Sequence, residues 1–204
     1  MGQRLNVEIT NKGDPLCNCY MHWSAYTGSA LYITKELIEN YNILKSSITD
    51  PLLLAVRMLE KITNVSFITG EKTYAGACEN SLVFLKEKYP GEEFNIATDR
   101  NAGFISVIED DMENTRKWEE GRVEIDIGDK TINFEVGYYM DTNEFIEEMT
   151  DCEIDYDFSN MPITTLDFGA LPFSKIDIFI DLLKLSSDIL ILSKNYVEIF
   201  SSIE

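Results

Sequence analysis

Apolar and polar residues alternate along two neighbouring stretches near the start of the chain, and this alternation constrains the fold more than any other feature. Leu5, Val7 and Ile9 alternate with polar residues within 3–9, and the pattern returns in residues 16–25 after the turn sequence NKGDP. A period of two places the apolar side chains on one face of a half-buried strand. Two such strands joined by a short turn predict an antiparallel hairpin.

The same pattern fixes the register of this hairpin, because apolar residues must meet apolar residues across the strands. Placing Ile9 opposite Cys17 satisfies the rule along the whole hairpin and pairs Glu8 with Asn18 on the other face. Arg4 then lies opposite His22. The predicted polar side of the hairpin carries Arg4, Glu8, Asn18, His22 and Ser24.

This polar side contains His22, the only histidine in the chain, and an imidazole exchanges protons near neutral pH. Ser24 lies two residues further along the same strand face, roughly 7 Å away, which is too far for a nucleophile and its base. Arg4 beside His22 favours the neutral imidazole and can hold an anion. One interpretation of these residues is that they form an ordinary sheet face whose polar groups are hydrogen bonded to one another.

The alternative is a pocket for a small ligand or anion on this face. In its binding form, the expected ligand-binding residues are Arg4, Asn18, His22 and Arg100, the last of these in the turn sequence TDRNAG. In its hydrolytic form, the expected catalytic residues are Arg4, Glu8, His22 and Ser24.

The remaining pattern predicts helices and further hairpins. Helical periodicity covers about 28–43, the stretch TDPLLLAVRMLEKI from Thr49, and 71–89. Strands follow on both sides of a turn at 99–101, and a hairpin over 122–140 turns at Gly128-Asp129 as a two-residue loop. Residues 108–122 are expected to form a solvated loop and 150–173 an irregular segment. One or two apolar helices are predicted over 174–201.

This order of elements predicts an α+β fold in a single domain over residues 1–204. Antiparallel hairpins at 3–25 and 94–140 form a layered sandwich with helices at about 28–89 and 174–201. The domain includes an acidic segment at 135–157 and an apolar helical segment at 174–201.

Charge is distributed unevenly along the chain. It has 36 acidic and 17 basic residues, and its formal net charge is −19. The interval between Lys130 and Lys175 contains ten carboxylates and no lysine or arginine. This one-sign interval indicates a surface that steers a basic partner, although a solvated face gives the same pattern. The expected partner-binding residues are Glu144, Glu147, Glu148, Asp151, Glu153, Asp155 and Asp157.

The leading functional hypothesis is therefore a non-catalytic, cytoplasmic interaction protein that engages a basic protein. In its sharpest form it is a phage or mobile-element counter-defence inhibitor that occupies a nucleic-acid-binding groove by charge mimicry. Direct nucleic-acid binding is disfavoured, because such proteins need a basic footprint. An assembly of identical copies through the apolar segment at 174–201 is a third hypothesis.

Familiar motifs give no support for catalysis. The sequence has no Walker loop, GxGxxG, HExxH or GxSxG pattern, and its four cysteines match neither a zinc site nor a CxxC pair. No cofactor and no metal are expected. The start MGQRLN lacks an apolar signal-peptide core, and no apolar run is long enough to span a membrane, so a cytoplasmic location is expected.

Overall fold

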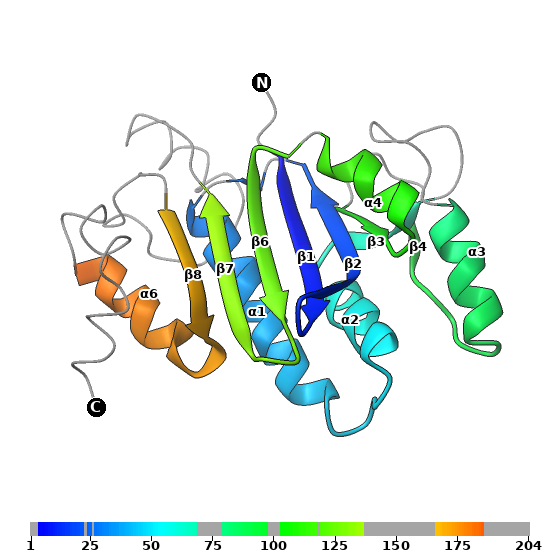
Figure 1. Cartoon of the computed structure of the whole chain (residues 1–204), viewed down its shortest axis with the longest axis horizontal. Helices are drawn as coiled ribbons and strands as arrows, with labels where there is room; N and C mark the ends of the chain where they lie inside the picture. The colour runs from blue at the N-terminus through cyan, green and yellow to red at the C-terminus, as the bar shows by residue number, and fades with distance from the viewer. Residues whose placement is uncertain are drawn as a thin grey trace.

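The computed structural model describes residues 4–22, 24–25, 27–68, 79–97, 103–117, 119–136 and 166–185. These residues adopt an α+β fold, which confirms the predicted fold class: an eight-stranded mixed sheet packs with five helices (Figure 1). The strands are β1 (Leu5–Asn11), β2 (Asp14–Met21), β3 (Val65–Ile68), β4 (Ile96–Ala97), β5 (Gly103–Ser106), β6 (Gly121–Asp126), β7 (Thr131–Val136) and β8 (Leu166–Pro172). The helices are α1 (Thr27–Leu44), α2 (Pro51–Glu60), α3 (Glu79–Lys88), α4 (Glu109–Arg116) and α6 (Ile176–Leu185), with a short 3₁₀ turn at Phe173–Lys175.

The strands lie in the order β4-β3-β5-β2-β1-β6-β7-β8. Neighbours are antiparallel except for the pairs β3–β4, β3–β5 and β1–β6. The parallel pairing of β1 with β6 brings residues more than a hundred positions apart into one register, with Glu8 beside Glu124. The centre of the sheet is therefore built from the first hairpin and the strand that follows α4.

The first hairpin has the predicted register. Ile9 pairs with Cys17, and Glu8 pairs with Asn18 on the opposite face. The side chains of Leu5, Val7 and Ile9 are fully buried, as the alternation requires. This apolar face forms the main core with residues of α1, α2 and α6.

The first two predicted helices are also confirmed. α2 begins as its sequence indicates: Pro51 occupies the first turn, and the Asp50 side chain accepts a hydrogen bond from the Leu53 amide at 2.9 Å. A proline at this position costs no helical hydrogen bond, and the aspartate satisfies one of the free amides.

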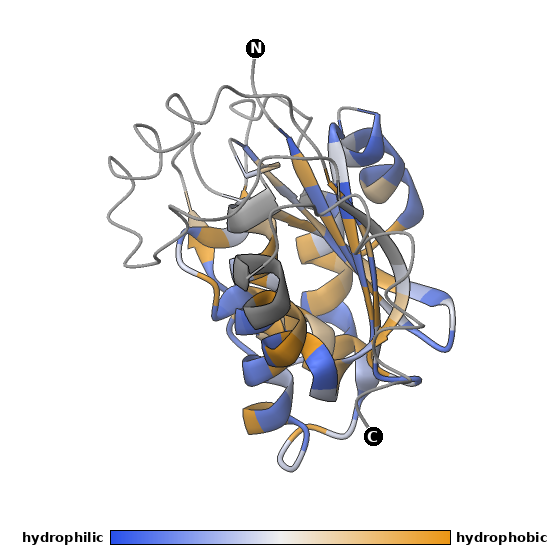
Figure 2. Cartoon of the chain, turned by 90° about the vertical axis from the view of Figure 1, so that its left-hand side faces the viewer, coloured by the Kyte–Doolittle hydropathy of each residue, from blue (hydrophilic) through white to orange (hydrophobic). Residues whose placement is uncertain are grey.

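Figure 2 shows the sheet nearly edge-on, with the larger group of helices on one side of it. α4 lies on the other side, because it bonds to Asn18, whose side chain points away from the main core. The two faces of the sheet therefore differ: one is apolar and covered by helices, and the other is polar and only partly covered by α4.

The prediction that residues 94–108 form a hairpin is wrong. β4 and β5 are not neighbours, because β3 lies between them and pairs in parallel with both. β3 was not among the strands predicted from the sequence. Its four residues are all buried, so the stretch shows no alternation between an exposed and a buried face.

Three local predictions also need correction. Residues 108–122 contain α4 rather than only a loop, and its inner side buries Asp111, Met112 and Thr115. The segment expected to be irregular contains β8, which pairs with β7. The turn between β6 and β7 spans four residues, since Asp126 pairs with Thr131, and its left-handed residue is Lys130 (φ 58°) rather than Gly128.

Several expectations fall outside the described residues: the start of the helix predicted at 71–89, the turn at 99–101, the acidic residues 141–157 and the end of the 174–201 segment. No helix in the described part of the chain is both long and apolar enough to cross a membrane.

Candidate functional site

The polar face of the sheet is the side that carries Asn6 and Glu8 of β1, Asn18 of β2, and Arg122 and Glu124 of β6. Asn6 and Asn18 are fully buried on this face, and Glu8 is 1% exposed. A buried carboxylate costs free energy unless it is paired and hydrogen bonded. Glu8 therefore requires a positive charge and hydrogen-bond donors close to its carboxylate.

Two arginines from different elements hold the Glu8 carboxylate. Arg116 of α4 donates to one oxygen at 2.7 Å, and Arg122 of β6 donates to the other at 2.7 Å. Arg116 also reaches Glu109, at 3.1 Å. Because each arginine is bound to Glu8 through a charged hydrogen bond, the cluster links α4 and β6 to β1.

Asn18 makes the second attachment of α4. Its amide nitrogen donates to the Thr115 hydroxyl at 2.9 Å and to the Met112 carbonyl at 3.3 Å. The Glu8–Asn18 pair predicted from the register is therefore real, and both residues lie against α4. Their observed contacts position the helix.

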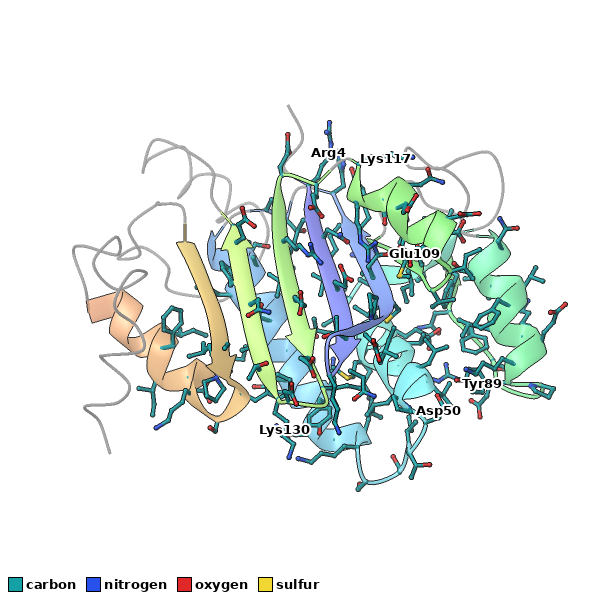
Figure 3. All side chains as sticks on the ribbon, in the orientation of Figure 1. Arg4, Asp50, Tyr89, Glu109, Lys117 and Lys130 are labelled. Carbon is teal, nitrogen blue, oxygen red and sulfur yellow. The ribbon has the colours of Figure 1, made fainter. Side chains whose placement is uncertain are left out.

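His22 lies near the end of β2 that is furthest from the β1–β2 turn. Its Nδ1 is 3.1 Å from the Tyr20 hydroxyl, and the Ser24 hydroxyl donates to the His22 carbonyl at 3.4 Å. Burial lowers the pKa of His22, and the positive charge of Arg4 lowers it further, against an opposing effect of Glu120. Figure 3 shows Arg4 at the start of β1. Because its pKa is lowered, the His22 imidazole is neutral at neutral pH.

The structure divides the predicted polar residues into two groups. Glu8 and Asn18 form the cluster with α4, whereas His22 and Ser24 lie beyond the end of the hairpin pairing. Glu8 is level with Asn18, four residues before His22, and four residues of strand span roughly 13 Å. Glu8 is thus far from His22, and Ser24 bonds to a backbone oxygen. Arg100 lies outside the described residues, as do all seven predicted partner-binding acids.

We expect that replacing Arg4 with glutamine will raise the pKa of His22. The change removes the positive charge that opposes protonation and leaves the burial of the ring largely in place. An NMR titration of the imidazole should therefore show protonation at higher pH in Arg4→Gln than in the native protein.

The matched control for this titration is Lys12→Gln, which removes one positive charge at the opposite end of β1, in the β1–β2 turn. This control should leave the titration of His22 almost unchanged. An Arg4→Gln titration that moves no further than the control would contradict a direct effect of Arg4.

Sequence reasoning missed Arg116 and Arg122 as members of the cluster. Arg122 could have been found, because it alternates with the buried Val123 and so belongs to the polar face. Arg116 lay in a segment interpreted as a loop, and no pattern linked it to a residue more than a hundred positions earlier.

Unpaired polar atoms concentrate around this cluster. Five buried side-chain atoms in the described part of the chain lack a hydrogen-bond partner, and one of them is the Ser66 hydroxyl. The other four are Asn6 Oδ1, Asn18 Oδ1, Arg116 Nε and Arg122 Nε. Buried polar atoms are normally paired, so this concentration marks the polar face as the strongest candidate site.

Within the described ranges, no group of three or more histidine, cysteine, aspartate or glutamate side chains is arranged to hold a metal ion. The sequence matches no protein-family model, and neither a curated protein nor a solved structure matches it.

Proposed function

We propose that this chain is a non-catalytic, cytoplasmic interaction protein that binds a basic protein partner through an acidic surface. One observation carries the proposal: ten carboxylates and no lysine or arginine lie between Lys130 and Lys175, in a chain of net charge −19. Such a concentration of one sign raises the encounter rate with an oppositely charged surface.

The exposed residues of the polar side agree with this proposal. Glu113 of α4 and Glu135 of β7 are exposed, and neither forms a salt bridge within the described part of the chain. Cys17 is a free, buried thiol, as expected of a protein from a reducing compartment.

The partner that fits best is a protein whose own ligand is a nucleic acid. Such a protein presents a groove rich in lysine and arginine, and carboxylates spaced along a surface can occupy it in place of phosphates. Binding of this kind weakens as salt rises, because the charges are screened.

The test is a pull-down from the lysate of the native host at low and at moderate salt. The native protein is compared with a variant carrying Glu147→Gln, Glu148→Gln, Asp151→Asn and Asp155→Asn. We expect a basic protein to be retained by the native chain at low salt, lost at moderate salt, and not retained by the fourfold variant.

The matched control is a second fourfold variant, Asp14→Asn, Glu39→Gln, Glu87→Gln and Glu93→Gln. It removes the same charge from exposed positions elsewhere in the molecule and should still retain the partner. Equal loss in both variants would reduce the effect to net charge, and retention by both variants at both salt concentrations would overturn the proposal.

A further inference from the structure

α4 lies on the polar face of the sheet and is itself almost entirely polar. Figure 3 shows Glu109 and Lys117 at the two ends of this helix. Met112 is the only apolar residue in the helix, and it belongs to neither of the two clusters of buried apolar side chains in the described residues. The hydrophobic effect therefore contributes little to the attachment of α4. α2, on the other face, buries a row of apolar side chains: Leu52, Leu54, Ala55, Val56, Met58 and Leu59.

Polar contacts attach α4 to the sheet instead. The Thr115 hydroxyl accepts a hydrogen bond from Asn18 of β2 at 2.9 Å, and Arg116 donates to the buried Glu8 of β1 at 2.7 Å. When such contacts break, water takes the place of each partner, so each contributes far less to stability than its strength in a dry interior. These contacts therefore hold α4 less firmly than apolar packing holds α2.

The attached position of α4 also leaves polar atoms unpaired. Asn18 Oδ1 and Arg116 Nε are both buried and have no hydrogen-bond partner within the described part of the chain. Water would supply a partner to each atom if α4 moved away from the sheet. Two unpaired groups therefore oppose the attachment of the helix.

The chain on either side of α4 is held independently of the helix. Before it, Val107 is part of the main core and Ile108 packs against that core. After it, Gly121 begins β6, which pairs with β1. Near its first end, Asp111 accepts a hydrogen bond from the backbone amide of Ser81 in α3 at 3.0 Å, which is again a polar contact. The helix is therefore a short polar segment between two anchored points.

We propose that α4 is a strap that opens while the sheet and the main core stay folded. An isolated helix of this length is unstable in water, so α4 loses its helical hydrogen bonds when it leaves the sheet. In the open form Asn18 and Glu8 become accessible to solvent, and Glu8 keeps only Arg122 as its partner. The strap gives the polar face two states, one covered and one open.

Native-state hydrogen exchange of the ¹⁵N-labelled full-length protein tests the strap. The Lys117 amide bonds to the Glu113 carbonyl at 3.3 Å within the last turn. We expect this amide and those of Thr115 and Arg116 to exchange through a local opening that depends little on urea. The amides of β1 should exchange only through global unfolding, which exposes much more surface and depends strongly on urea.

Two variants separate a local opening from global unfolding. Ile9→Val removes one carbon atom from the main core, which stays packed in the open form. It should accelerate exchange in β1 about two- to tenfold and leave α4 unchanged. Thr115→Val keeps the shape of the side chain but removes the acceptor for Asn18. Because this contact exists only in the closed form, the change should accelerate exchange in α4 about two- to tenfold.

The control Thr49→Val removes a hydroxyl from an exposed position between α1 and α2 and should leave exchange in α4 unchanged. Equal acceleration of α4 and β1 by Ile9→Val would overturn the strap, because α4 would then open only when the whole protein unfolds. Exchange in α4 that does not respond to Thr115→Val would also overturn it, since the helix would then fray without leaving the sheet.

Discussion

Replacing Glu8 with glutamine is expected to lower the free energy of unfolding by about 2–3 kcal/mol. Glu8 is 1% exposed and accepts one hydrogen bond from each of Arg116 and Arg122. Glutamine has nearly the same shape, so no cavity forms. It removes the negative charge between two partly exposed guanidinium groups and turns an N–H donor toward one of them, so a buried amide N–H is left without an acceptor and one arginine loses its charged hydrogen bond. Urea unfolding followed by circular dichroism measures the change.

The matched control is Glu109→Gln, which removes a carboxylate that contacts the same Arg116. The Glu109 side chain is 62% exposed, and an exposed pair contributes at most about 1 kcal/mol. A loss in Glu8→Gln no larger than the loss in this control would show that the buried cluster contributes little to stability.

Much of the fold could be predicted because its central elements carry strong local signals. The alternation around Ile9 and Cys17 predicted both the existence and the register of the first hairpin. Pro51 indicated the start of α2, with Thr49 or Asp50 as the possible cap, and the structure shows that Asp50 is the cap. The parallel pairings could not be predicted. A short strand that is buried on both faces, such as β3, has no period, and nothing local shows that β1 will pair with β6.

The same division applies to the candidate site. Strand alternation placed Glu8 and Asn18 on one face, because it depends only on neighbours in sequence. The role of Glu8 depends on Arg116 and Arg122. These two arginines come close to Glu8 only because the chain passes through α4 and β6 then pairs with β1. A polar strand face can be predicted from sequence, but the partners of its buried charges come from tertiary structure.

Asp126 supplies the other large expected effect, because its buried carboxylate joins the two turns at one end of the sheet. One oxygen accepts from the backbone amides of Lys12, Gly128 and Asp129 at 2.8–3.0 Å. The other accepts from the Gly13 amide at 2.7 Å and from the Thr10 hydroxyl at 3.1 Å. The asparagine oxygen can still accept the hydrogen bonds from Lys12, Gly128 and Asp129, but the asparagine nitrogen cannot accept those from Gly13 and Thr10. Asp126→Asn should therefore lower the free energy of unfolding by about 2–3 kcal/mol near neutral pH.

The pH dependence of this cost has a definite sign. Burial by itself raises the pKa of Asp126, but the hydrogen bonds from Asp129, Lys12, Gly13 and Thr10 outweigh it, and the net pKa is lowered. A carboxyl whose pKa is lower in the folded state contributes its full stability above its unfolded pKa of about 3.9 and loses it as pH falls through the folded pKa. The difference in the free energy of unfolding between the native protein and Asp126→Asn should therefore be constant from about pH 7 to 5 and become smaller below about pH 4.

Asp129→Asn is the control for this measurement, since Asp129 is exposed and lies three residues further along the same turn. It removes the same charge without touching the carboxylate that binds the two turns, so its effect at neutral pH should be less than about 0.5 kcal/mol. Urea unfolding of the three proteins across this pH range separates the hydrogen-bonded carboxylate from the net charge of the chain. A cost of Asp126→Asn that stays the same below about pH 4 would show that the asparagine disturbs packing, and that the ionised carboxylate is not what holds the turns together.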